Sequence, residues 1–163
     1  MSVLGIIFAN IYGSSMGELA NKRTMGSLPF GGRYRQIDFF LSNMGNSGIR
    51  RVGIVSRHNY QSLMDHIGSG KDWDLARRSG GIKILAPSIQ GNQSYSGLGF
   101  SSRLEALKAI SSNLMHIKED YIIMADCDGI CNIDFNDMLR DHIAHNADVT
   151  MMVKRIRLNG PVT

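Results

Sequence analysis

The sequence lacks the features that mark secreted, membrane-spanning and zinc-binding proteins. Its 163 residues include only two cysteines, Cys127 and Cys131, and their C-x-x-x-C spacing is not a structural zinc pattern, so we expect two reduced thiols. No apolar run nears the ~18 residues of a membrane span. The N-terminus has neither the basic start nor the long apolar core of a signal peptide. We therefore expect a cytoplasmic protein without a membrane partner.

A strong excess of one charge is also missing. Lys and Arg number 18 and Asp and Glu 14, which gives a net charge of +4. The sequence shows no clustered basic stripe of the kind that binds nucleic acid, so we expect no nucleic-acid partner. A mildly basic chain suits anionic small ligands such as sugar phosphates and nucleotides. There is no internal repeat or low-complexity segment, and 163 residues suffice for one domain with a sizeable core.

Short apolar runs alternate with segments of helical spacing along the chain. The run VLGIIFA at residues 3–9 is apolar throughout, as expected for a central strand buried on both faces. The runs predict five strands, at residues 3–9, 52–56, 82–85, 120–125 and 147–153. Such alternation predicts an α/β fold, with an open, mostly parallel sheet and helices on both faces.

Two helices after the third predicted strand carry legible start signals. Ser102 and Glu105 fit a capping box, and apolar residues beginning with Leu104 follow at helical spacing. Asp134 can cap the next helix. The preceding segment, residues 91–99, is rich in Gly, Ser and Asn and predicts a mobile surface loop.

Ligands of open α/β sheets bind at the carboxyl ends of the strands. Three segments are expected there: the residues after Ala9, the loop before Ser102, and residues 126–131. We therefore look for chemistry in these segments first.

The most informative stretch is residues 28–47, where a turn leads into an amphipathic helix. Asp38 near the helix start favours the helix macrodipole, and we expect it to stabilise that end rather than to act as a catalyst. The apolar residues at helical spacing predict a face that packs on the core; they are Ile37, Phe40, Leu41 and Met44.

The turn before this helix is a candidate anion or effector site. Gly31 and Gly32 allow the backbone to approach a ligand closely, and Arg33 and Arg35 place two guanidinium groups beside them. The alternative interpretation is a solvated basic turn. The largest positive grouping in the sequence contains Arg33, Arg35, Arg50, Arg51 and Arg57.

Two stretches also resemble a known family. Residues 29–49, PFGGRYRQIDFFLSNMGNSGI, resemble the FGGxYRxIDFxLSNxxNSGI segment of bacterial ADP-glucose pyrophosphorylases, which are glucose-1-phosphate adenylyltransferases. Residues 62–75, SLMDHIGSGKDWDL, resemble the GlgD branch of that family, whose members accompany a GlgC-type catalytic subunit in glycogen-making bacteria.

The resemblance implies a fold and its boundaries. It predicts a Rossmann-like nucleotidyltransferase domain of the GT-A type. Family members continue through more of the sheet and then a left-handed β-helix domain. Residues 1–163 are therefore expected to be the truncated N-terminal portion of such a domain.

The family's nucleotide loop is degenerate in this sequence. Catalytic members carry GGxGxRL after the first strand and then a KP motif, and backbone N–H groups of such a loop cradle phosphates. Here Ser15 stands at the arginine position and Met25 at the lysine position. Asn10, Gly13 and Ser14 remain as the remnant of the loop. Losing one preorganised donor costs ~10²–10³ in rate, so the resemblance predicts impaired catalysis.

The family's metal position is retained. Catalytic members bind Mg²⁺ through an aspartate after the fourth strand, and Asp128 falls on it. Asp126 lies two residues earlier, and we expect both on one strand face; solvated carboxylates at a strand end are the alternative. The family's GTADA segment, which lies against the sugar nucleotide, is replaced by SRLEA at residues 102–106, and Glu105 is expected to be a capping acid.

These observations predict a regulatory, catalytically impaired subunit that activates a GlgC-type partner in glycogen biosynthesis. The partner makes ADP-glucose and pyrophosphate from ATP and glucose-1-phosphate. One alternative is a divergent adenylyltransferase that uses Asp128 and Mg²⁺. Another is a binding module for sugar phosphates or nucleotides without a catalytic partner.

Overall fold

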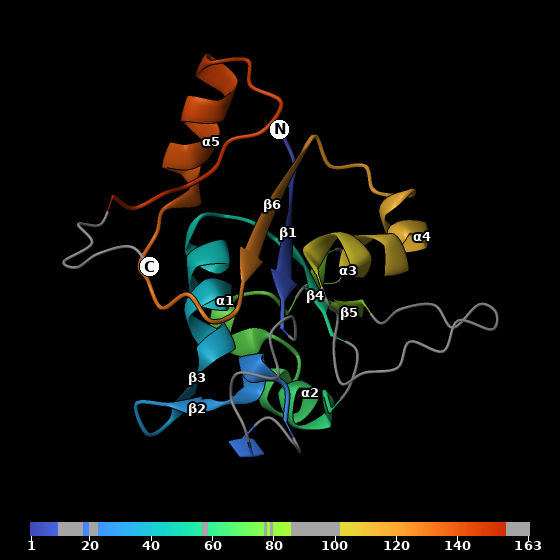
Figure 1. Ribbon diagram of the computed structural model, residues 1–163, viewed down its shortest axis with the longest axis vertical. Coiled ribbons are helices and arrows are strands. Elements are labelled where there is room, and N and C mark those ends of the chain that lie inside the picture. The colour runs from blue at the N-terminus through green and yellow to red at the C-terminus, as the bar shows by residue number, and fades with distance from the viewer. Residues whose placement is uncertain are drawn as a thin grey trace, which may run out of the picture. The chain divides into compact units, whose positions relative to one another are not determined.

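A computed structural model describes residues 1–9, 18–19, 23–56, 59–76, 78, 80–85 and 102–155 (Figure 1). The chain forms two compact units, Met1–Ile133 and Asp134–Thr163. The predicted surface loop at residues 91–99 lies outside the described residues.

A four-stranded sheet organises the first unit. Its order is β5-β4-β1-β6, and every neighbouring pair is parallel. The strands are β1 (Val3–Phe8), β4 (Arg51–Val55), β5 (Gly81–Leu85) and β6 (Tyr121–Asp126). This arrangement confirms the predicted parallel sheet and its first four strands. β1 lies inside the sheet, which explains why its sequence is apolar without alternation.

Helices cover both faces of the sheet. On one face, Leu4, Ile6 and Phe8 of β1 cluster with Ala106 and Ile110 of the segment α3 (Arg103–Ala109) and α4 (Ser111–Leu114). Side chains of a strand alternate in direction. The other face of β1 is therefore that of Gly5, where Met44 of α1 (Gln36–Asn46) packs so closely that its Sδ lies 2.8 Å from the place a Cβ would take.

Local hydrogen bonds start the helices as predicted. The Asp38 carboxylate accepts the Arg35 backbone N–H at 2.9 Å at the start of α1. Ser102 Oγ accepts the Glu105 N–H at 3.1 Å, which confirms the first half of the predicted capping box. The Asp134 carboxylate accepts the Asn136 N–H at 2.9 Å and begins α5 (Phe135–Ala144).

The apolar residues that begin with Leu104 do not all pack on the core. Leu104 is 68% exposed. The predicted helix is broken at Ile110, between α3 and α4, so the apolar spacing does not form one continuous face. Leu107, Leu114 and Ile117 do pack against the cluster.

The predicted fifth strand is also wrong. Residues 147–153 are described, and they form no strand. Val149, Met151 and Val153 are 82%, 76% and 79% exposed. A strand needs a neighbour for its backbone hydrogen bonds, and no described strand pairs with this segment. In the part of the chain that the structure describes, no helix is long and apolar enough to cross a membrane.

Candidate functional site at the carboxyl edge of the sheet

The carboxyl ends of the central strands are joined by backbone hydrogen bonds. The Ala9 N–H donates to the Val55 carbonyl at 2.9 Å, and the Cys127 N–H donates to the Phe8 carbonyl at 3.1 Å. This edge therefore presents β1, β4 and β6 as one rigid platform. The predicted loop residues Asn10, Gly13, Ser14 and Ser15 directly follow this platform in the chain but lie outside the described residues.

Met25, which the resemblance places at the family's lysine position, is buried. It begins the short 3-10 helix η2 (Met25–Ser27), and only 5% of its surface is exposed. The helix is held against the edge, because the Gly26 N–H donates to the Ala9 carbonyl at 3.2 Å. A Cβ at Gly26 would lie 3.3 Å from the Ala9 Cβ and 3.6 Å from that of Cys127. The Met25 side chain therefore packs in the apolar core beside the candidate site.

Two buried hydroxyl groups flank the same edge. Thr24 precedes η2 and Ser56 follows β4, and neither is exposed. Within the described residues, neither hydroxyl oxygen has a hydrogen-bond partner. Buried polar groups are normally paired, so these hydroxyls are groups that could bond a polar ligand at this edge.

An ion pair between α3 and β6 crosses the candidate site. The Arg103 Nε donates to Asp126 Oδ1 at 3.0 Å, and its Nη2 contacts Asp126 Oδ2. The pairing is bidentate, the geometry in which guanidinium and carboxylate bind best. The side chains are 50% and 23% exposed. The sequence places both residues at carboxyl ends, but the pairing was not predicted.

Asp128 lies beyond the strand rather than on it. β6 ends at Asp126, and Asp128 follows in an exposed turn, so the prediction that the two carboxylates share a strand face is wrong. Cys127, between the two carboxylates, is buried in the core at 1% exposure. Burial raises the pKa of the Cys127 thiol, and the charges of Asp128 and Asp126 raise it further. The thiol is therefore protonated near neutral pH and a poor metal ligand.

Both cysteines are free, as predicted. In the described ranges, no group of three His, Cys, Asp or Glu side chains could hold a metal ion. Asp128 remains an exposed single carboxylate, and its role in Mg²⁺ binding stays a prediction.

The predicted glycine turn is a hairpin. Strands β2 (Pro29–Phe30) and β3 (Tyr34–Arg35) pair antiparallel around it. Gly31 and Gly32 have φ values of +58° and +88°, a region that other residues rarely adopt. The Phe30 ring packs edge-on against Phe39 of α1 at 5.4 Å between centroids. The glycines are thus explained by the turn itself.

The arginines of the turn already have partners. Arg35 Nη1 donates to Ser62 Oγ at 2.9 Å and contacts the Ser62 carbonyl, which ties the hairpin to α2 (Gln61–Ile67). Burial lowers the pKa of Arg35, and the positive charge of Arg23 lowers it further. The Arg33 guanidinium lies 5.5 Å from the centre of the Tyr34 ring. Whether these residues bind an effector stays a prediction.

The wider arginine grouping is not brought together. Arg33 and Arg35 precede α1, whereas Arg50 and Arg51 follow it. An 11-residue helix separates the two groups by about 16 Å along its axis. Arg50 pairs with Asp74 at 2.6 Å and Arg51 with Glu119 at 2.7 Å. Arg57 lies outside the described residues.

Asp38 makes a contact that the sequence did not reveal. Its Oδ1 lies 2.6 Å from His66 Nε2, so the residue that starts α1 also holds α2. The His66 ring in turn contacts Trp73 at 5.9 Å between ring centroids. Asp38 is therefore a packing and capping residue, as predicted for the helix end.

The fold and the position of these residues define a nucleotidyltransferase-type domain. The chain belongs to the nucleotidyl transferase family, whose family model matches residues 4–160. This confirms the predicted family and fold. A putative glucose-1-phosphate thymidylyltransferase from Bacillus anthracis, solved in complex with a sucrose, has the same fold at a TM-score of 0.64. The match covers 88% of this chain and 51% of that chain, at 17% sequence identity.

The chain is also similar to individual curated relatives. It is 39% identical over 159 residues to the glycogen biosynthesis protein GlgD of Geobacillus stearothermophilus and 38% identical over 152 residues to that of Bacillus subtilis. It is 36% identical over 162 residues to a glucose-1-phosphate adenylyltransferase of Clostridium acetobutylicum. These matches cover 95%, 91% and 96% of the chain but 44%, 42% and 40% of the relatives. The chain thus spans less than half the length of these relatives.

Proposed function

We propose that this chain belongs to a GlgD-type subunit of glycogen biosynthesis that is catalytically impaired. It activates a GlgC-type glucose-1-phosphate adenylyltransferase, which makes ADP-glucose and pyrophosphate from ATP and glucose-1-phosphate. The observation that carries the proposal is the burial of Met25 at the position of the family's catalytic lysine.

The chemistry of position 25 supports impairment. Phosphoryl transfer depends on cations that stabilise charge on the reacting phosphate and the leaving pyrophosphate. A methionine packed in the core supplies neither charge nor hydrogen bond there. Ser15 replaces the second cation in the sequence. The loss of each donor lowers the rate by ~10²–10³, so the loss of two leaves little of an enzymatic rate.

The carboxylates at the end of β6 fit Mg²⁺ only in part. Mg²⁺ is usually held by one or two carboxylates together with substrate phosphates. Arg103 engages Asp126, which leaves Asp128 as the carboxylate for the ion. Asp128 would hold Mg²⁺ only beside a bound nucleotide, and the ion would then neutralise phosphate charge.

Activation requires no chemistry in this subunit. A partner subunit raises turnover when it binds the active conformation of the enzyme more tightly than the inactive one. The alternative, a divergent adenylyltransferase, is favoured by the exposed Asp128 at the family's Mg²⁺ position. The second alternative, a binding module, is favoured by the buried hydroxyls of Thr24 and Ser56.

Pyrophosphate release distinguishes these functions. The full-length protein alone is expected to release no pyrophosphate from ATP and glucose-1-phosphate, and to accelerate release when a GlgC-type subunit is added. Release at an ordinary enzymatic rate by the protein alone would overturn the proposal. Thermal stabilisation by nucleotide without any effect on GlgC would favour the binding module.

A double substitution tests the physical reason. Ser15→Arg with Met25→Lys is expected to restore measurable release if the rest of the site is competent. The matched control, Ser15→Gln with Met25→Leu, has similar volumes without the charges and is expected to stay silent. Equal activity of the two variants would contradict the role given to the missing cations.

A further inference from the structure

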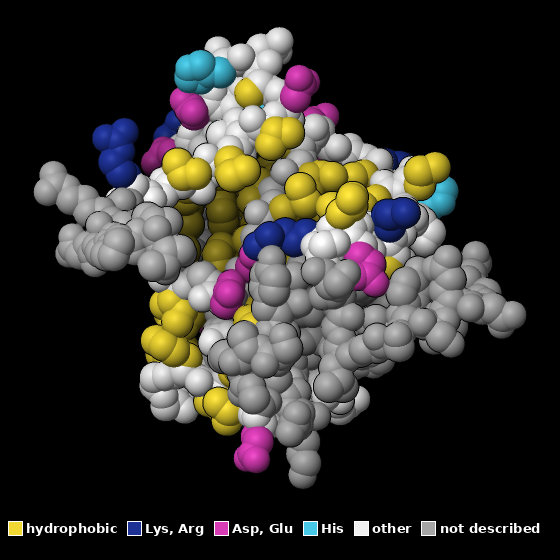
Figure 2. All heavy atoms as spheres, in the orientation of Figure 1, with side chains coloured by type: hydrophobic (Ala, Val, Ile, Leu, Met, Phe, Trp, Pro, Cys, Tyr) yellow, Lys and Arg dark blue, Asp and Glu magenta, His cyan; other side chains and the backbone are white. Residues whose placement is uncertain are grey.

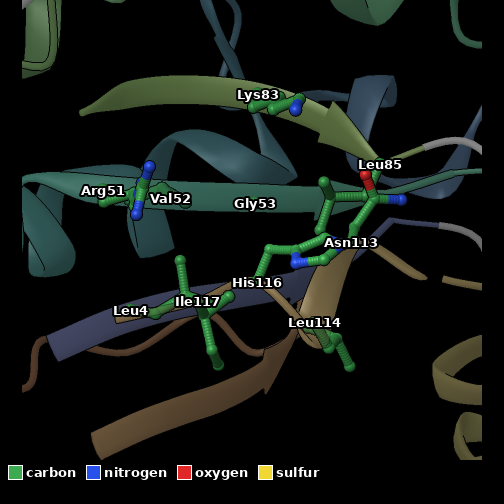
Figure 3. A pocket seen from close by; sticks show the side chains of 10 residues that line it. All are labelled: Leu4, Arg51, Val52, Gly53, Lys83, Leu85, Asn113, Leu114, His116 and Ile117. Carbon is green, nitrogen blue, oxygen red and sulfur yellow. The ribbon is translucent and has the colours of Figure 1, made fainter. Parts of the chain in front are cut away.

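A cavity of about 170 Å³ opens on the α3–α4 face of the sheet, beside the first half of β4. Figure 3 shows Lys83 of β5 on one side of β4 and Asn113 and His116 of the α4 region on the other. Arg51, the first residue of β4, closes one end. Asp126 and Cys127 are not among its lining residues, so the cavity is separate from the carboxyl-edge site.

The floor of the cavity is aliphatic and rigid. Leu4 of β1 and Leu85 of β5, the strands on either side of β4, are 5% and 7% exposed. Leu114 and Ile117 complete the apolar lining. Gly53 has no side chain to fill the space, and Leu85 leans over it, with its Cδ1 2.6 Å from the place a Cβ would take. An apolar cavity of ~150 Å³ accepts a benzene ring, so one six-membered ring fits here.

The rim of the cavity is cationic. Glu119 holds the Arg51 guanidinium at 2.7 Å, which fixes its position. Lys83 is exposed and has no ion-pair partner among the described residues. Asn113 and His116 add an amide and an imidazole, both able to donate hydrogen bonds. The rim therefore combines one cation paired with a carboxylate, one cation without an ion-pair partner among the described residues, and two further hydrogen-bond donors.

We propose that this cavity is a binding site for a small anion that carries a single ring. The ring packs on the aliphatic floor, and its phosphate or carboxylate group faces Arg51 and Lys83. An apolar floor alone would favour neutral ligands, and a cationic rim alone would favour free ions. Their combination within 170 Å³ selects an anion with a compact apolar body. The site is independent of the proposed function, because it shares no residue with the carboxyl edge.

Phenyl phosphate is the probe for this site. In a titration of the ¹⁵N-labelled 163-residue chain, it is expected to shift the backbone amides of Gly53, Lys83 and His116 with saturation. Inorganic phosphate alone and phenol alone supply only the charge or only the ring, and each is expected to bind more weakly. Lys83→Gln is expected to weaken phenyl phosphate binding about fivefold, the size of one exposed ion pair.

Lys108→Gln provides the matched control. Lys108 is exposed on α3 and does not line the cavity, so its loss is expected to leave binding unchanged. Equal weakening by the two substitutions would overturn the site, as would absence of saturable shifts at the three amides. Shifts confined to Arg103 and Asp126 would place the ligand at the carboxyl edge and overturn the proposal while leaving the proposed function untouched. If inorganic phosphate bound as tightly as phenyl phosphate, the proposed contribution of the apolar floor to binding would be overturned.

Discussion

Several side chains in this protein form ion pairs with residues that are distant in the sequence. Arg103 meets Asp126, His66 meets Asp38, and each pair joins two elements. The chemistry of a carboxylate at the end of β6 is thus decided by a residue 23 positions earlier. Two further side chains, a glutamate and a cysteine, give predictions that titration and labelling can check.

Glu119 contributes to stability in a pH-dependent way. Burial works to raise its pKa, but hydrogen bonds from Arg51 and from the Lys118 backbone N–H hold it below the ordinary 4.5. A pKa that is lowered by folding gives stability that is complete above the unfolded-state value and lost as the pH falls through the folded-state value. Glu119→Gln is therefore expected to lower the thermal midpoint at neutral pH, with the difference from wild type shrinking below about pH 4.

The control for Glu119 is Glu18→Gln. Glu18 is exposed, and it forms no ion pair within the part of the chain that the structure describes. Its substitution is expected to leave the midpoint at neutral pH unchanged. A difference for Glu119→Gln that persists undiminished in acid would contradict the assignment of the low pKa to this carboxyl group.

The two thiols are expected to react in a fixed order. Burial raises the pKa of both, but Cys127 is 1% exposed and Cys131 is only partly buried. Because the thiolate is the reactive form, a thiol reagent should label Cys131 slowly in the folded state and Cys127 only after unfolding. Mass spectrometry of the Cys131→Ser variant measures this directly. Rapid labelling of that variant without denaturant would show that Cys127 is accessible.

At the scale of elements, the glycine inside α1 is explained by a close backbone contact rather than by helix propensity. Gly45 lies inside the helix, where alanine is normally more favourable by about 1 kcal/mol. A Cβ at this position, however, would lie 2.6 Å from the Trp73 carbonyl oxygen, and a backbone atom cannot move away as a flexible side chain can. The contact fixes α1 against η3 (Lys71–Trp73).

Gly45→Ala is therefore expected to destabilise the protein by about 1–3 kcal/mol, the usual range for overpacking. Urea unfolding measures the change. Asn46→Ala, at the exposed next position of the same helix, serves as the control and should stay within about 0.5 kcal/mol of wild type. A stabilised Gly45→Ala protein would mean that helix preference outweighs the contact.

The sequence predicted the elements well because their signals are local. The continuous apolar run of residues 3–9 gave the central strand, and Asp38, Ser102 and Asp134 gave three helix starts. Residues 147–153 have the same apolar character as a strand but no strand partner among the described residues, and composition carries no information about partners. An apolar run therefore predicts a strand correctly only where the fold supplies a neighbouring strand.

The candidate site was predictable in location but not in detail. The carboxyl-edge rule placed Ser102 and residues 126–131 in the right region. The Arg103–Asp126 ion pair depends on the distance between α3 and β6, which no local pattern encodes. The arginines lie apart because the length of α1 separates them, and the sequence did indicate this helix.

At the scale of the whole molecule, β6 is one of the two edge strands of the described four-stranded sheet. Ile122 and Met124 point to the α3–α4 side and are 40% and 54% exposed. Figure 2 shows apolar side chains gathered on this face of the molecule. An exposed edge with apolar neighbours is a surface that pairs readily with another chain.

The 163-residue chain is accordingly expected to self-associate as its concentration rises. Met124→Lys places a charge on the exposed part of β6 and should reduce association, as measured by sedimentation velocity. Met115→Lys is the control, because Met115 is 81% exposed but lies in the turn after α4, away from the edge strand. Equal effects of both substitutions would attribute association to net charge alone.

The sulfur of Met44 rests against the bare backbone of Gly5 in the middle of the sheet. Met44 has no exposed surface, whereas Met115 is among the most exposed methionines. Peroxide converts an accessible thioether to a polar sulfoxide and spares one that solvent does not reach. The oxidation rate of Met44 relative to that of Met115 would therefore measure how often the sheet opens transiently, without any added label.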